Sequence, residues 1–204
     1  MWRLCVIFLL SWLSLSIKAW DFKTGDLIFL AEGKGAFSKA ISDATATSDS
    51  LKFVHVGIIE VDSLGHVNVI EASPEEGVRI IGFEKFTPDS VIYVVKRLSI
   101  AFDAEGAVKR AKEHLGEPYD WWYLPSNDRM YCSELVYESY LDEAGRPIFE
   151  ARPMNFRRPD GTMPEFWIEL FNELGEEVPE GIPGTNPADL SRDSRLVIVN
   201  REFV

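Results

Sequence analysis

The sequence predicts one α+β domain in which a small antiparallel sheet packs against helices. The chain has 204 residues, a length that suits a single domain with a sizeable core. Its first half holds β-rich segments joined by short turns, and segments with helical spacing of apolar residues follow them. The hydrophobic content of 46% is typical of a globular protein.

The first 19 residues are predicted to be a secretory signal peptide. Arg3 gives a cationic start, residues 4–17 are almost entirely apolar, and Ala19 is the expected cleavage position, with Ser16 as an alternative. An uncleaved membrane anchor is the other reading, but the run is short for a full span. The mature chain, residues 20–204, is therefore expected to be secreted or periplasmic, without a stable membrane span.

Charge and cysteine content narrow the classes of function. Cleavage removes two cations, Arg3 and Lys18, and moves the net charge from −12 to −14. A protein this acidic repels phosphate backbones, which argues against nucleic acid as a partner. Cys5 lies in the signal segment, so Cys132 is the only thiol of the mature chain and has no internal disulfide partner. It is a small core residue, an intermolecular link or a reactive thiol.

The expected strands lie in the first half of the chain. Residues 53–61 and 66–72 alternate as strands do and form a hairpin around the turn 62–65, which pairs Val61 with His66. Residues 33–50 are expected to contain a short helix and a loop. The other strands are predicted at residues 26–30, 77–82 and 91–98.

Helical spacing dominates the next part of the chain. A helix is expected over residues 103–115, and a second one runs from Cys132 to Ala144, where Gly145 ends it. An aromatic loop, residues 118–130, joins them. The C-terminal part, residues 146–204, holds seven of the eleven prolines and is expected to be loop-rich, with one helix near 164–174 and a last strand near 195–203.

Cys132 is the predicted nucleophile. It falls in the first turn of its helix, where free backbone N–H groups and the helix dipole favour a thiolate. The same N–H groups are suited to hold the oxyanion of a tetrahedral intermediate. The alternative is a buried structural cysteine, but the polar residues Ser133 and Glu134 that follow it favour the reactive thiol.

A thiolate requires a histidine, and three are available. His55 lies inside an apolar β-segment, where a polar ring requires a partner. His66 follows a turn and His114 ends a helix, so both are weaker candidates. Glu71 lies on the paired strand and would orient the imidazole. The predicted register places Glu71 one residue from His55, and a shift of one residue would bring the two side chains to the same face.

Six motifs in fixed order carry a resemblance to a known family. Residues 21–145 closely resemble the permuted papain-like amidases of the YaeF/YiiX type, which belong to the NlpC-type cysteine hydrolase superfamily. The histidine and the glutamate precede the cysteine here, in the permuted order. The motifs are Gly25-Asp26-Leu27-Ile28-Phe29, His55-Val56-Gly57, Ile70-Glu71-Ala72, Tyr93-Val94-Val95-Lys96-Arg97, Leu115-Gly116-Glu117-Pro118-Tyr119-Asp120 and Tyr131-Cys132-Ser133-Glu134-Leu135-Val136.

The resemblance implies a circularly permuted papain-like fold and a catalytic set of Cys132, His55 and Glu71. It also implies that Tyr119 borders the substrate cleft, with core packing as the alternative. Asp26 is similar to the acidic residue that opens the first strand of the family, where it would contact substrate or support the backbone. Neither a metal nor an organic cofactor is implied.

The resulting hypothesis is a cysteine hydrolase that works through an acyl-enzyme on Cys132. Its substrate would be an amide, or an ester or thioester, of a lipid-like molecule or of a cell-wall peptide. A non-catalytic module that binds a small molecule in the same cleft and an acyltransferase are the alternatives. The sequence carries no signal for the oligomeric state.

Overall fold

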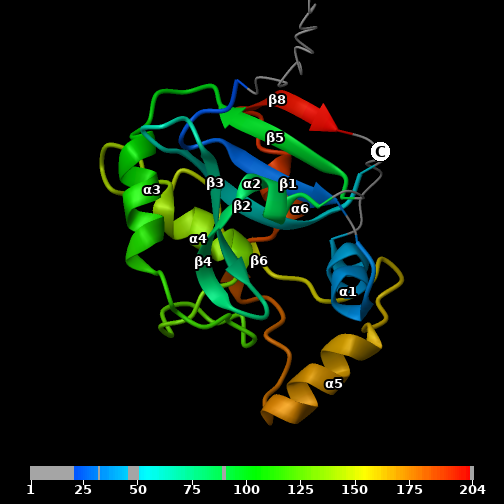
Figure 1. The fold of residues 1–204 in the computed structure, drawn as a ribbon. Helices are drawn as coiled ribbons and strands as arrows, with labels where there is room; N and C mark the ends of the chain where they lie inside the picture. Colours follow the sequence, from blue (N-terminus) through cyan, green and yellow to red (C-terminus); the bar gives the residue numbers. More distant parts are fainter. Residues whose placement is uncertain (1–20, 32, 46–50, 89–90, 203–204) are drawn as a thin grey trace, which may run out of the picture.

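The computed structural model describes residues 21–31, 33–45, 51–88 and 91–202, so the predicted signal peptide lies outside the described residues. Within them, one antiparallel sheet of six strands has the order β4-β3-β2-β1-β5-β8 (Figure 1). Each predicted strand of the first half is present, with its ends shifted by no more than two residues. The strands are β1 (Leu27–Ala31), β2 (Phe53–Val61), β3 (Val67–Ser73), β4 (Gly77–Gly82), β5 (Tyr93–Leu98) and β8 (Leu196–Glu202).

Helices and a short strand pair surround this sheet. No helix of the described residues is long and apolar enough to cross a membrane. The pair of short strands, β6 and β7, is separate from the main sheet. The elements are α1 (Ala36–Ala44), α2 (Phe83–Phe86), α3 (Ala104–Glu113), α4 (Cys132–Ser139), α5 (Glu165–Leu174), α6 (Pro187–Ser191), β6 (Arg152–Pro153) and β7 (Pro183–Gly184).

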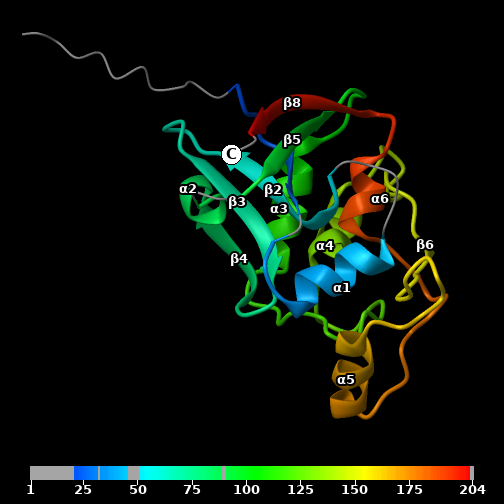
Figure 2. The same ribbon diagram turned by 90° about the vertical axis from the view of Figure 1, so that its right-hand side faces the viewer.

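Successive residues of a strand point to opposite sides of the sheet, so each face has its own set of apolar side chains. Helices pack on both faces. One face, with Phe29 and Ile58, joins the larger core together with α3 and α4. The other face, with Ile28 and Ile59, packs on the phenylalanines of α2. Figure 2 shows α2 and α4 on opposite sides of the sheet. The helix that begins at Cys132 therefore packs directly on the strands that carry His55 and Glu71, β2 and β3.

Helix α1 connects the sheet with α5. It contacts β2 on one side and α5 on the other, and α5 lies below it in Figure 2. The contact is aromatic: the ring of Phe37 lies 5.4 Å from that of Phe166 and 6.1 Å from that of Trp167, centroid to centroid. These ring contacts pack α5, which belongs to the C-terminal part of the chain, against α1.

Helix α4 ends at Ser139, so the prediction of a helix to Ala144 is wrong. Tyr140 is extended and fully buried, with its hydroxyl group donating to the carbonyl of Gly25 at 3.0 Å. A turn then follows in which the Asp142 carboxylate accepts the N–H groups of Ala144 and Arg146. The tertiary contact of Tyr140 outweighs the helical tendency of the next residues, and Gly145 belongs to this turn.

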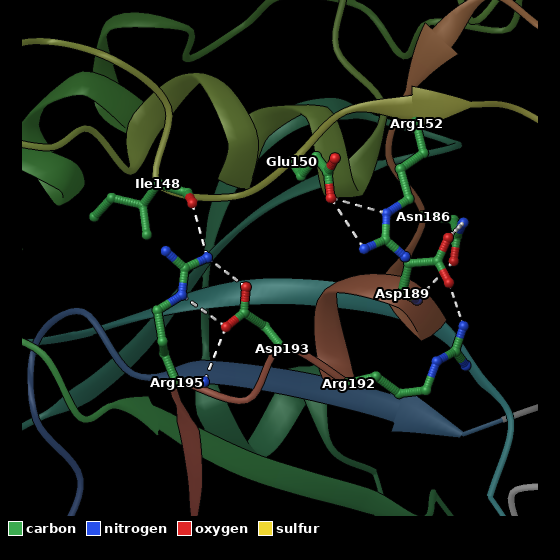
Figure 3. A network of polar contacts seen from close by, with 8 residues as sticks. All are labelled: Ile148, Glu150, Arg152, Asn186, Asp189, Arg192, Asp193 and Arg195. Atoms are coloured by element: carbon green, nitrogen blue, oxygen red, sulfur yellow. Dashed lines mark hydrogen bonds and ion pairs between the residues drawn. The ribbon is translucent and has the colours of Figure 1, made fainter.

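Polar contacts join segments of the C-terminal part to one another (Figure 3). Arg195, just before β8, donates to the carbonyl of Ile148 at 2.8 Å and also pairs with Asp193. Asn186 caps α6 by accepting the N–H of Asp189 at 2.8 Å. Strand β8 pairs with β5 along its length. The segment expected to be loop-rich therefore supplies an edge strand of the main sheet.

Candidate active site

His55 and Glu71 lie on one face of the β2–β3 hairpin. The predicted pairing of Val61 with His66 is wrong, because Val61 lies opposite Val67 and Ile58 opposite Ile70. This register extends to Gly57 opposite Glu71, which places the side chains of His55 and Glu71 on the same face as diagonal neighbours. Relative to the predicted pairing, β3 is shifted by one residue. This shift brings the side chains of His55 and Glu71 together.

The turn of the hairpin explains the register. The Asp62 carboxylate accepts the N–H groups of Leu64 and His66, and the N–H of Asp62 donates to the carbonyl of His66. Gly65 has φ of +85°, a conformation that glycine adopts without strain. The loop is thus one residue longer than the turn predicted over residues 62–65, and the whole of β3 moves by one position.

The carboxylate of Glu71 holds the ring of His55 from one side. His55 Nε2 and Glu71 Oε2 are 2.6 Å apart. The neighbouring strand β4 places Arg79 directly opposite Glu71, and Arg79 Nε donates to Glu71 Oε1 at 2.9 Å. Arg79 also pairs with the more exposed Glu76 at 2.6 Å. One oxygen of the Glu71 carboxylate therefore faces histidine and the other faces arginine.

Arg79 was not singled out from the sequence. The signal available was an arginine inside the predicted strand 77–82, next to the strand that carries Glu71, since opposite charges often pair across neighbouring strands. Burial favours the neutral acid, but the hydrogen bonds and charges of His55 and Arg79 outweigh it and hold the pKa of Glu71 below its usual 4.5. Glu71 is thus an anion at neutral pH.

Cys132 approaches the other side of the His55 ring. The thiol is buried, with 4% of the residue exposed, and Cys132 is near enough to the imidazole to interact with it electrostatically. Since Nε2 faces Glu71, Nδ1 is the ring nitrogen left for the sulfur. Burial of the ring disfavours its charge, but Cys132 and Glu71 together outweigh burial and raise the pKa of His55 from 6.5 to about 10. His55 is therefore an imidazolium at neutral pH.

The first turn of α4, where Cys132 lies, has backbone N–H groups without intrahelical partners. The first intrahelical bond runs from the N–H of Leu135 to the carbonyl of Tyr131, so the N–H groups of residues 132–134 precede it. Glu134 accepts the N–H of Tyr131 at 3.4 Å. Burial, with help from Asp120, raises the pKa of Glu134 to about 8. Glu134 is therefore protonated at neutral pH and places no negative charge two residues from Cys132.

Tyr119 and Asp26 lie in different surroundings. Tyr119 is buried and lines the same cavity as Cys132. Burial raises the pKa of its hydroxyl well above the usual 10.0, so the group stays protonated. Asp26 is fully buried in an ion pair with Arg97, at 2.6 Å, and also accepts the N–H of Lys23. The structure brings Tyr119 to the cysteine and leaves Asp26 outside the cavities beside it.

The two remaining histidines are engaged elsewhere. His66 is exposed at the hairpin turn and pairs with Asp62 at 2.9 Å. His114 follows α3 and pairs with Glu117 at 3.0 Å. His55 is therefore the histidine that the structure places beside Cys132.

An antiparallel sheet, a histidine and a carboxylate on its strands, and a cysteine that follows them in the chain define a papain-like cysteine hydrolase in permuted order. The chain belongs to the family of permuted papain-like amidases, YaeF/YiiX, C92, whose sequence model matches residues 21–200. The match extends beyond residues 21–145, which carry the resembling motifs, into the C-terminal part.

Two individual proteins are also similar to this chain over most of its length. The uncharacterised protein YiiX of Escherichia coli strain K12 is 29% identical over 212 residues, which span 98% of this chain and 96% of that protein. A crystal structure of YiiX from Escherichia coli O157:H7, described as a metalloprotein, matches with a TM-score of 0.74 at 26% identity. It covers 91% of this chain and 100% of the YiiX chain.

The side chains of the described residues do not fit a metal centre. Among the described residues, no group of three His, Cys, Asp or Glu side chains is placed to hold a metal ion. Near the thiol, Glu71 is already bonded to His55 and Arg79.

Proposed function

We propose that the protein is an amidase in which Cys132 is the nucleophile, His55 the acid and base, and Glu71 the residue that orients His55. The observation that carries this proposal is a buried imidazole that lies 2.6 Å from a carboxylate and interacts electrostatically with the buried Cys132. The three side chains come from α4, β2 and β3, and the arrangement matches the general pattern of an activated nucleophile.

The reaction has two stages. The Cys132 thiolate attacks the carbonyl carbon, the C–N bond breaks, and the imidazolium of His55 gives its proton to the leaving amine. The neutral imidazole then takes a proton from water, whose oxygen attacks the thioester carbon, and the C–S bond breaks to restore thiolate and imidazolium. The free N–H groups at the start of α4 are suited to bind the oxyanion in both stages.

The substrate is proposed to be a lipid-like or cell-wall peptide amide. Cys132 lines a cavity rich in aromatic side chains, a surface that suits an apolar group next to the cleaved bond. Export of the mature chain to the periplasm or the exterior would bring it to such substrates, and the cationic and apolar start of the sequence supports this localisation.

Thiol reactivity tests the catalytic assignment. We expect iodoacetamide to alkylate Cys132 near neutral pH faster than a free-thiol model compound, and His55→Ala to remove that advantage. His66→Ala is the matched control, because His66 is an exposed histidine paired only with Asp62 at the hairpin turn. Equal rates for Cys132 and the model thiol, unchanged in His55→Ala, would sink the proposal.

Turnover separates hydrolysis from its alternatives. The purified protein is incubated with muropeptides and with N-acyl amino acids, and the products are identified by mass spectrometry. Release of a free acid and an amine supports the hydrolase, whereas an acyl group found on an added amine identifies an acyltransferase. Cys132→Ser should abolish either product.

A further inference from the structure

Cys132 lies at the wall of a cavity that has aromatic sides and no charge. We call it the aromatic pocket, and its main lining residues are Tyr119, Tyr123, Tyr131, Phe156, Trp167 and Thr185. No Asp, Glu, Lys, Arg or His is found among its described lining residues. Its empty space, with the open solvent at its mouth included, is about 490 Å³.

A second hollow lies on the histidine side and, unlike the first, has charged residues among its lining. We call it the charged groove, and it is lined by His55, Glu71, Glu75, Arg79 and Lys85 among others. Ile41 of α1 borders both cavities. The thiol and the imidazole, which interact electrostatically, therefore separate an uncharged pocket from a charged groove.

This division fixes the direction in which an amide binds. The acyl carbon becomes bonded to the sulfur of Cys132, which lines the aromatic pocket. The leaving nitrogen must reach the proton of His55, which lines the charged groove. The acyl group thus belongs to the aromatic pocket and the amine to the charged groove.

Buried polar atoms of residues that line the aromatic pocket constrain the acyl group further. Trp167 Nε1 and Ser133 Oγ are buried and have no hydrogen-bond partner in the described part of the chain. Tyr123 Oη and Thr185 Oγ1 also lack a hydrogen bond, although each lies beside another hydroxyl group, that of Tyr119 or Tyr131. All four atoms belong to residues that line this one pocket.

Buried polar atoms without partners are rare because each loses its hydration. The indole N–H of Trp167 is a donor only, so it requires an acceptor. A plain alkyl chain would fill the pocket and leave this donor and the Ser133 hydroxyl group unpaired. A charged acyl group would find no counter-ion there.

We propose that the aromatic pocket selects an uncharged acyl group that carries its own hydrogen-bond acceptor oxygen, which Trp167 and Ser133 recognise. The proposal rests on the proposed function, because it assigns the acyl side of that reaction. Two sources share this chemistry: the amide carbonyl of a peptide-derived acyl group, and the hydroxyl or keto oxygen of an oxygenated fatty acyl group.

Chloromethyl ketones test the pocket without requiring turnover. The thiolate sulfur displaces chloride from the methylene carbon, so a C–S bond forms, the C–Cl bond breaks, and the acyl group stays in its pocket. Four probes of similar length are compared on the full-length protein: N-acetylalanyl, hydroxyacyl, plain alkyl and succinyl. We expect at least one oxygen-bearing neutral probe to inactivate Cys132 about tenfold faster than the alkyl probe, and the succinyl probe to be slowest.

Variants identify the recognising groups. Trp167→Phe keeps an aromatic ring and removes the N–H, and it should slow the oxygen-bearing probe about tenfold more than the alkyl probe. Trp122→Phe is the matched control, since Trp122 lies outside the pocket against Arg129. Ser133→Ala is the second reporter, and circular dichroism establishes that each variant is folded.

The outcomes are distinct. Faster reaction of the N-acetylalanyl probe identifies a peptide-derived acyl group, and faster reaction of the hydroxyacyl probe identifies an oxygenated fatty one. If the alkyl probe reacts as fast as both, or if Trp167→Phe and Ser133→Ala slow all probes alike, the pocket proposal is wrong while the amidase proposal stands. If no probe reacts faster with Cys132 than with a free-thiol compound, the amidase proposal is overturned and the pocket proposal with it.

Discussion

His55 holds its proton because Cys132 and the Glu71 carboxylate both interact with its ring inside a buried site. The sulfur of Cys132 lies on one side and the Glu71 carboxylate on the other, at 2.6 Å. Their effect exceeds that of burial and raises the pKa of His55 to about 10. An imidazolium present before substrate binds is ready to protonate a leaving amine, the harder leaving group of an amide.

The pH dependence of amide cleavage follows from this shift. We expect kcat to fall as the pH rises through about 10, because His55 then loses the proton that the leaving amine requires. The part of the folding stability that comes from this raised pKa is fully present below about pH 6.5 and is lost as the pH rises through about 10. Glu71→Gln should move the high-pH limb of the rate profile to lower pH, and an unmoved limb would contradict the assigned partner.

Arg79 stabilises the anionic form of Glu71, so removal of the Arg79 side chain should change activity by raising the pKa of Glu71. In Arg79→Met, burial is opposed by His55 alone and the pKa of Glu71 should rise. We expect kcat/KM to fall about tenfold at neutral pH and further in acid. Arg152→Met is the control, because the ion pair of Arg152 with Glu150 is exposed. Equal losses in the two variants would show that Arg79 has no specific role.

At the scale of elements, the β2–β3 hairpin sets the distance between histidine and glutamate. Gly57 lies opposite Glu71 in the extended register, two residues from His55. A Cβ atom at this position would approach Val69 Cγ1 to 2.4 Å and Phe86 Cζ to 3.3 Å. Close packing of neighbouring side chains over this glycine allows the hairpin and α2 to stay together.

Gly57→Ala is therefore expected to distort the hairpin. Overpacking of this kind costs about 1–3 kcal/mol of unfolding free energy, and the reactivity of Cys132 should fall as the His55 ring moves. Gly82→Ala is the matched control, since a Cβ there meets nothing within 4 Å. Urea unfolding and the rate of thiol alkylation measure the two effects. A fully stable Gly57→Ala variant with unchanged alkylation would refute this role of the hairpin.

At the scale of the whole molecule, the C-terminal part is integral to both sheet and pocket. Strand β8 pairs with β5, and Trp167 of α5 lines the aromatic pocket together with Phe156 and Thr185. Within this part, the polar network around Arg195 joins the start of β8 to Ile148 (Figure 3). Residues beyond 145 are also covered by the family match.

A chain that ends at residue 145 should fail to fold cooperatively. It would expose the edge of β5 and the buried side chains that now pack on Trp167 and Phe171. We expect no sharp thermal transition by circular dichroism and aggregation on expression. A chain that ends after residue 202 is the control and should melt like the full-length protein. A cooperative transition in the shorter chain would contradict this role.

Export is the second expectation at this scale. Expression of the full sequence in a Gram-negative host should yield a periplasmic protein that lacks residues 1–19, as intact mass spectrometry would show. Arg3→Glu should reduce processing, because the cationic start supports export. An unprocessed chain that remains with the cells' cytoplasmic fraction would contradict the signal-peptide prediction.

Local patterns along the chain were enough to predict most elements. Alternation of apolar residues located the strands, and helical spacing located α3 and the start of α4 at Cys132. The same patterns singled out His55, because a polar ring inside an apolar strand requires a partner. These properties depend on neighbouring residues, which a sequence displays directly.

Contacts between distant parts of the chain fixed the rest. The Asp62 turn set the register that brings Glu71 to His55, and the buried Tyr140, bonded to Gly25, ended α4 five residues before the predicted end at Ala144. Arg79 and Trp167 join the site from β4 and α5, elements that no local pattern connects to Cys132. Register, helix ends and pocket walls follow from packing and burial across the molecule, and these exist only once the chain has folded.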